Sequence, residues 1–131
     1  MPSIRQLRLV VHAENLEEAV AFYRDALGMP VAEEYADGDA QVVILDAGRA
    51  TLELSNTAQI ELIDDVEVGR RVAPHFRLAL EVDDAESATR SALAAGAEQI
   101  APPTRTPWNS LNSRLAAPAE VQLTLFEELG K

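Results

Sequence analysis

The chain has 131 residues, 47% of them hydrophobic, and a formal net charge of −11, which predicts one globular unit or two small halves sharing a core. Its 22 acidic residues against 11 basic ones argue against a nucleic-acid-binding protein, because such proteins present a basic surface. The absence of cysteine excludes disulfides and thiolate metal sites. No apolar run reaches the about 18 residues of a membrane span, and the N-terminus lacks the pattern of a signal peptide. We therefore expect a cytoplasmic protein that binds neither nucleic acid nor membranes.

The first half of the chain is predicted to fold as a strand, a helix and three further strands. Residues 4–12 alternate between apolar and polar side chains, as in a strand with one face in a core. Asn15 and Glu18 have the spacing of a helix N-cap and capping box, and Gly28 suits the end of that helix. Its apolar face would carry Leu16, Val20, Tyr23 and Leu27. The three strands are expected at residues 29–35, 41–46 and 50–55, the last two as a hairpin.

Residues 57–73 show weaker periodicity and are interpreted as the connector between the two halves. They carry an acidic patch followed by two arginines: Glu61, Asp64, Asp65 and Glu67, then Arg70 and Arg71. A run of charges of this kind is typical of a solvated loop. We therefore expect such a loop here, with a lid as the second interpretation.

The second half, residues 74–128, repeats the plan of the first. Residues 75–82 alternate as a strand does, and they lead into a helix that Asp83 or Asp84 would cap. The next strand begins near residue 97 and is expected to stop at residues 102–103, since these two prolines cannot donate to a ladder. A further strand segment and a last strand at residues 121–126 complete this half.

Equivalent positions in the two halves lie at nearly constant separations, which indicates a duplicated βαβββ module. The separations are 69 residues for Arg8 and Arg77, 69 for Asn15 and Asp84, 68 for Gly28 and Gly96, and 71 for Glu53 and Thr124.

Together these features resemble the vicinal oxygen chelate superfamily, which includes glyoxalase I, extradiol dioxygenases, fosfomycin-resistance enzymes and bleomycin-resistance binding proteins. The motifs that carry the resemblance are residues 15–23 with Leu27-Gly28-Met29, then Leu52-Glu53-Leu54, residues 80–84 and residues 117–123. The likeness covers nearly the whole chain. It implies an α+β fold, in which two tandem βαβββ modules form a cupped mixed β-sheet with helices on the outer face. It also implies a homodimer.

In the metal-dependent members of this superfamily, four side chains from four strands hold one divalent ion inside the cup. The resemblance places these positions at Arg8, Glu53, Arg77 and Thr124. Only Glu53 is a usual ligand, because a guanidinium has no lone pair to offer. The alternation agrees that all four side chains face the cavity, since their apolar neighbours must face the helices. We therefore expect neither a metal ion nor another cofactor.

The preferred interpretation is a metal-free small-molecule-binding protein with an arginine-lined cavity. Arg8 and Arg77 would hold polar or anionic groups of the ligand, and Glu53, paired with one of them, would orient it. Trp108 would pack against the apolar part of the ligand, and Thr124 would line the site.

Several alternatives stay open. The chain could be an enzyme of the lyase, isomerase or dioxygenase type, using Glu53 either in a non-standard metal site or as a metal-free base. It could also be a structural module in which Arg8, Glu53 and Arg77 form an ion-pair network and Trp108 packs in an interface. A shifted register would bring His75 beside Glu53 as two metal ligands; otherwise His12 and His75 are surface or rim residues. Polar rim groups are expected at Asn109, Asn112 and Arg114.

Overall fold

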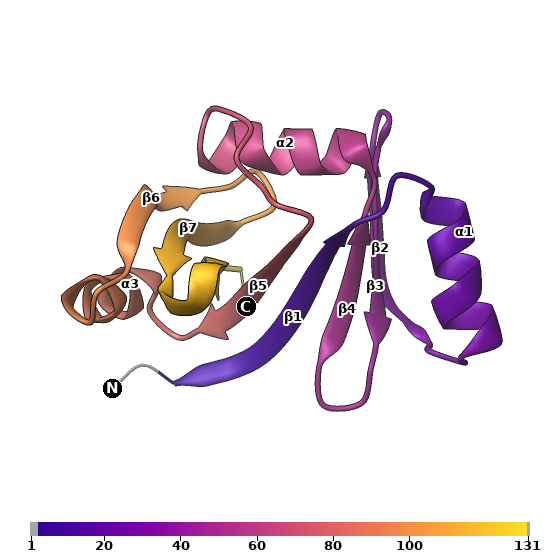
Figure 1. Cartoon of the computed structure of the whole chain (residues 1–131), viewed down its shortest axis with the longest axis horizontal. Coiled ribbons are helices and arrows are strands. Elements are labelled where there is room, and N and C mark those ends of the chain that lie inside the picture. Colours follow the sequence, from indigo (N-terminus) through magenta and orange to yellow (C-terminus); the bar gives the residue numbers. More distant parts are fainter. Residues whose placement is uncertain (1–2, 131) are drawn as a thin grey trace.

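A computed structural model of the chain describes residues 3–130 and contains eight strands in one mixed sheet (Figure 1). The strands are β1 (Ile4–His12), β2 (Val31–Asp37), β3 (Ala40–Asp46), β4 (Thr51–Ser55), β5 (Phe76–Val82), β6 (Glu98–Arg105), β7 (Ser110–Ala117) and β8 (Val121–Glu128). Their order across the sheet is β2-β3-β4-β1-β5-β8-β7-β6. Among the described residues, none of the helices combines the length and apolar character that crossing a membrane requires.

The sheet is built from two equivalent halves that meet in its centre. β1, the first strand of the first half, pairs in antiparallel fashion with β5, the first strand of the second half. The last strand of each half lies parallel to the first, β4 beside β1 and β8 beside β5. This arrangement confirms the predicted α+β fold of two βαβββ modules.

Two helices cover the outer face of the sheet, one for each module (Figure 1). In the first module α1 (Leu16–Val20) continues as a π-helical segment, η1 (Ala21–Ala26). In the second module α3 (Ala85–Ala94) takes the equivalent place, and a 3₁₀ turn, η2 (Pro118–Glu120), joins β7 to β8. Each helix packs on its own apolar core, α1 with buried residues of β3 and β4, and α3 with buried residues of β5, β7 and β8.

Both predicted helix starts carry side-chain caps. Asn15 accepts a hydrogen bond from the backbone N–H of Glu18 at 3.1 Å. Of the two candidates in the second module, Asp84 is the cap, and it accepts from the N–H of Ser87 at 3.0 Å. Each cap satisfies a backbone donor that the first turn of a helix leaves unpaired.

Leu27 departs from the predicted apolar face of the first helix, because it is 57% exposed. The N–H of Leu27 bonds to the carbonyl of Phe22, five residues back, at 3.1 Å. A π-helical turn holds more residues than an α-helical one. It therefore rotates Leu27 away from the face that Leu16 and Val20 bury.

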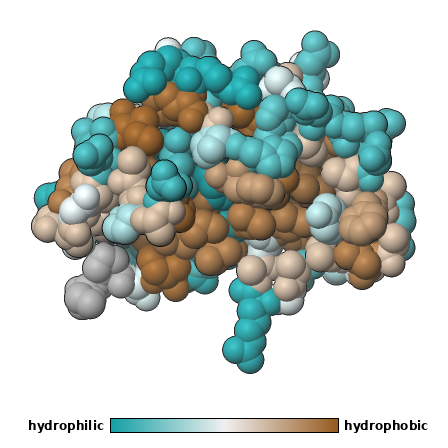
Figure 2. Space-filling view, in the orientation of Figure 1, coloured by the Kyte–Doolittle hydropathy of each residue, from teal (hydrophilic) through white to brown (hydrophobic). Residues whose placement is uncertain are grey.

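The interpretation of residues 57–73 as a solvated loop is wrong, because this segment contains α2 (Thr57–Glu67). The helix crosses the side of the sheet opposite to α1 and α3, which we call the inner face (Figure 1). Asn56 caps it by accepting from the N–H of Gln59 at 2.9 Å. Its exposed side is acidic, and Figure 2 shows a hydrophilic upper edge where α2 runs.

The buried side of α2 explains why periodicity missed it. It consists of Ile60, Ile63, Asp64 and Glu67, so half of its buried positions are acidic. A search for an apolar stripe finds only part of such a face. Ile60 packs with Val10, Ala79 and Phe126 in a third core on the inner face.

The largest differences between the expected and the observed strand boundaries are in β2, β6 and β8. β6 runs through both prolines to Arg105, with register shifts between Gln99 and Thr104. It is an edge strand whose pairing with β7 is irregular at the prolines, and such positions tolerate a residue without an N–H. β2 begins two residues later than predicted, at Val31, and β8 continues two residues further, to Glu128.

Candidate functional site

A cavity of about 760 Å³ lies between the inner face of the sheet and α2. Its walls come from both modules, from α2 and from the turn that contains Pro107 and Trp108. A volume of this order suits a small organic ligand.

The five side chains predicted for the site all line this cavity: Arg8, Glu53, Arg77, Trp108 and Thr124. The sheet register brings the central ones together, because Val10 of β1 pairs with Glu53 on one side and with Arg77 on the other. Their roles as ligand contacts stay predictions.

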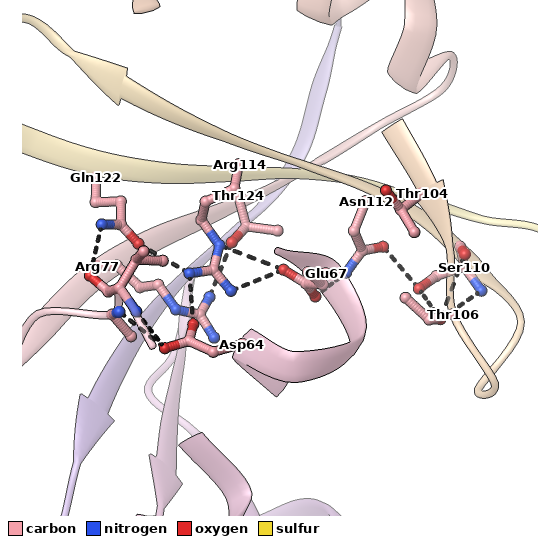
Figure 3. Close-up of polar contacts among 12 residues, drawn as sticks. Asp64, Glu67, Arg77, Thr104, Thr106, Ser110, Asn112, Arg114, Gln122 and Thr124 are labelled. Carbon is pink, nitrogen blue, oxygen red and sulfur yellow. Dashed lines mark hydrogen bonds and ion pairs between the residues drawn. The ribbon is translucent and has the colours of Figure 1, made fainter. Parts of the chain in front are cut away.

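Arg77 is buried with few partners for its five donors. The residue as a whole is only 5% exposed. Nη1 donates to the hydroxyl of Thr124 at 2.9 Å, and Nε is buried without a hydrogen-bond partner (Figure 3). Within residues 3–130 it forms no ion pair. Burial, and then the nearby charge of Arg114, lower the pKa of Arg77.

Glu53 is buried and loosely held. Its carboxylate lies 3.7 Å from Nη1 of Arg8 and accepts one long hydrogen bond, 3.5 Å, from the hydroxyl of Ser55. Of the two pairings that the sequence left open, the ion pair is with Arg8. Burial raises the pKa of Glu53, against the opposing charges of Arg77 and Arg8.

Arg8 is more fully engaged than Arg77. It lies 3.7 Å from a carboxylate oxygen of Glu33 as well as from Glu53. Its guanidinium is 5.0 Å from the ring centroid of Phe126, and Nε donates to the side chain of Gln6. Both guanidinium groups therefore keep unused donors at the cavity, but within residues 3–130 only Arg8 has carboxylates within ion-pair distance, whereas Arg77 has none.

A buried polar cluster, which was not predicted from the sequence, lies between α2 and β7 (Figure 3). Arg114 is fully buried and donates to Asp64, Glu67 and Gln122, each at 2.9 Å. The other oxygen of Glu67 accepts from the amide of Asn112 at 2.8 Å. Glu53 and Glu67 both line the cavity. Both carboxylate oxygens of Glu67 accept hydrogen bonds within the cluster, whereas Glu53 accepts only the long hydrogen bond from Ser55.

The expectation that Asn112 and Arg114 are rim groups is wrong, because both are buried under α2. Only Asn109 lies at the surface, where it accepts from Arg105 at 3.0 Å. One signal for the cluster was present: Asp64 and Glu67 are three residues apart, which places them on one face of a helix.

The residues at the family's ligand positions do not fit a divalent metal ion. Two of the four are arginines, which cannot ligate a cation. Within residues 3–130 no group of three or more histidine, aspartate or glutamate side chains is suited to holding a metal. The shifted-register alternative for His75 is also wrong, because Arg77 is the residue of β5 in register with Val10 and hence with Glu53. His75 is exposed, and His12 bonds to the hydroxyl of Thr57 at 2.7 Å.

Paired βαβββ modules around a cavity on the inner face of one sheet define a protein of the vicinal oxygen chelate type. Residues 5–125 match the Glyoxalase/Bleomycin resistance protein/Dioxygenase superfamily, so the chain belongs to this superfamily. No curated protein sequence matches the chain.

Several solved structures share the fold. A hypothetical protein from Bacillus halodurans C-125 has a TM-score of 0.70 at 12% identity, covering 99% of this chain and 96% of that one. Methylmalonyl-CoA epimerase from Mycobacterium tuberculosis has a TM-score of 0.62 at 21% identity, covering 95% and 87%. A glyoxalase/bleomycin resistance protein/dioxygenase superfamily member from Vibrio splendidus 12B01 has a TM-score of 0.63 at 12% identity, covering 96% and 100%. At these identities the likeness concerns the fold alone.

Proposed function

We propose that this chain binds a small molecule in the cavity, and that Arg77 holds a carboxylate, phosphate or carbonyl oxygen of that ligand. The observation that carries the proposal is the state of the Arg77 guanidinium, which is buried with a single hydrogen bond, to Thr124. A buried charge without partners is costly. An oxygen-rich ligand would supply the missing acceptors.

The surroundings of Arg77 support a ligand with an apolar part. Val42, Ile44 and Phe126 line the same cavity, and Trp108, 44% exposed, lies at its wall. Apolar walls with a few polar groups are the usual composition of small-molecule sites.

Trp108 also provides the test, because it is the only tryptophan. Its fluorescence should change on titration with at least one member of a panel of small carboxylates, phosphates and aromatic drugs. Methylmalonyl-CoA belongs in this panel, since one structure of similar fold is a methylmalonyl-CoA epimerase in complex with it.

Arg77→Gln should weaken binding at least tenfold. The matched control is Arg90→Gln, which changes an exposed arginine on α3. A panel without any response, or equal binding by Arg77→Gln, would contradict the proposal.

A second candidate function is a metal-free isomerase or lyase that uses Glu53 as a base. The observation that favours it is a buried carboxylate with a raised pKa and nearly free oxygens. A base of this kind can remove a proton from a carbon next to a carbonyl. Arg77 would stabilise the negative charge that develops on the carbonyl oxygen, and Glu53 would return the proton to a neighbouring atom on the same face of the intermediate.

The enzyme alternative can be tested without knowing the product. In D₂O the wild-type protein should exchange the hydrogen next to the carbonyl of a bound ligand, and NMR would follow the loss of its signal. Glu53→Gln should abolish the exchange while the ligand still binds. Glu34→Gln, which changes an exposed carboxylate outside the cavity lining, should leave the exchange rate unchanged. Binding without exchange would leave the chain as a binding protein.

The homodimer expected from the family resemblance also remains part of the proposal. Within residues 3–130, five large hydrophobic side chains are more than half exposed in the single chain: Ile4, Phe22, Leu27, Tyr35 and Phe76. Exposed apolar groups of this size favour contact with a partner. Light scattering should give twice the mass of one chain, and a monomer mass would contradict the dimer.

A further inference from the structure

The lining of the cavity changes chemical character between its buried centre and its exposed part. Four lining residues form what we call the mouth: Glu33, Tyr35, Trp108 and Glu128. Tyr35 is 60% exposed and Trp108 44%, whereas Arg77 on the same cavity is 5% exposed. The mouth thus combines aromatic and acidic side chains, while the buried centre presents a guanidinium.

The mouth is assembled from both modules. Glu33 and Tyr35 lie on β2, at one end of the sheet, and Glu128 lies at the end of β8 in the other module. Burial, and then Glu33, raise the pKa of Tyr35; the positive charge of Arg8 opposes them, and Glu128 adds the smallest contribution, in the raising direction. Trp108 is in the turn before β7, whose first residue, Ser110, pairs with Glu128.

The charges at the mouth are incompletely compensated. Glu33 shares Arg8 with Glu53, each at 3.7 Å. Glu128 forms no ion pair with any residue of the 3–130 range. Carboxylates attract an organic cation through its charge, and tyrosine and tryptophan rings attract it through cation–π contact.

We propose that the ligand is bipolar, with an organic cation, such as a protonated amine or a quaternary ammonium group, at the mouth and an oxygen acceptor at Arg77. This inference rests on the proposed binding function and specifies its ligand class. Acidic residues at a rim do not by themselves make a site. The independent observation is Arg77, a buried and largely unpartnered cation in the same cavity. The end of the ligand that reaches Arg77 must therefore be an anion or an oxygen acceptor, while the other end lies at the mouth.

The test uses two functional-group probes, so the natural ligand need not be known. Isotope-labelled protein is titrated with tetramethylammonium chloride and, separately, with sodium acetate, with sodium chloride as the control for ionic strength. Tetramethylammonium should shift the indole N–H signal of Trp108 and saturate. Acetate should shift the Nε–H signal of Arg77 and should still do so when tetramethylammonium is present. Glu128→Gln should weaken tetramethylammonium binding at least threefold and leave acetate binding unchanged.

Glu34→Gln is the matched control for the loss of one negative charge, since Glu34 is exposed and lies outside the cavity lining. The inference is overturned if tetramethylammonium moves Trp108 no more than sodium chloride does. It is also overturned if Glu128→Gln and Glu34→Gln behave alike, or if the two probes compete. Failure of the proposed function has a different signature, namely no response of Arg77 to acetate.

Discussion

Arg114 of β7 and Asp64 of α2 form a buried ion pair with 2.9 Å between Nη1 and Oδ1, although 50 residues separate them in the sequence. Glu67, one helical turn further along α2, binds the same guanidinium. Asp64 also accepts from the backbone N–H groups of Val72 and Ala73, each at 2.9 Å. Arg114 therefore binds α2 to β7, and Asp64 binds the segment that follows the helix.

Arg114→Met is expected to destabilise the protein strongly, because it leaves the buried Glu67 without its ion-pair partner and Asp64 with only the half-exposed Arg71, 3.7 Å away. Removing one partner of a buried ion pair typically costs about 3–5 kcal/mol. Urea unfolding would measure the loss, and Arg114→Lys, which keeps the charge but not the fork of donors, should lose less. A methionine variant within about 0.5 kcal/mol of the wild type, the range of ordinary surface changes, would show that the pair does not hold α2.

Asp64 should make stability depend on acid pH. Burial opposes its ionisation, but hydrogen bonds from Ala73, Val72 and Arg114 prevail and lower its pKa. An acid with a lowered folded-state pKa contributes stability above its unfolded value of about 3.9, and this contribution is lost as the pH falls through the folded-state pKa. Unfolding curves below about pH 4 should therefore decline more steeply for the wild type than for Asp64→Asn. Parallel curves would contradict this.

Glu53→Gln should stabilise the protein near neutral pH, the opposite of the effect at Asp64. The pKa of Glu53 is raised, so its ionisation costs stability above the folded-state pKa, and the cost vanishes below the unfolded value of about 4.3. A gain of about 1 kcal/mol is in the range for removing strain at a functional site. Thermal unfolding at several pH values would show the gain at pH 7 and its disappearance near pH 4. A loss at pH 7 would mean that Glu53 is structural.

Much of the fold was predictable because each βαβββ module follows local rules. The caps at Asn15 and Asp84, the alternation of the central strands and the repeat spacing are all readable from neighbouring residues. What failed depended on distant partners. The acidic face of α2 is buried only because Arg114 lies opposite, and the prolines of β6 are tolerated only because that strand is at an edge.

The site shows the same division. Alternation indicated that Arg8, Glu53 and Arg77 face inward, and all three line the cavity. Alternation could not reveal that Arg8 is shared between two carboxylates while Arg77 has only a threonine, because these pairings depend on β2 and β8. The distinction between the two arginines, on which the proposed function depends, needed the tertiary structure.

Thr124 gives a test of that distinction that does not require a ligand. Thr124→Val keeps the shape of the side chain but removes the only hydrogen-bond partner of Arg77 within residues 3–130. Loss of one partner of a buried polar group costs about 1–3 kcal/mol. In an Arg77→Gln background the same change should cost clearly less, since the charge that needs the hydroxyl is gone. A double-mutant cycle measured by urea unfolding gives the coupling directly. Additive costs would mean that Arg77 does not depend on Thr124 and does not lack acceptors in the free protein.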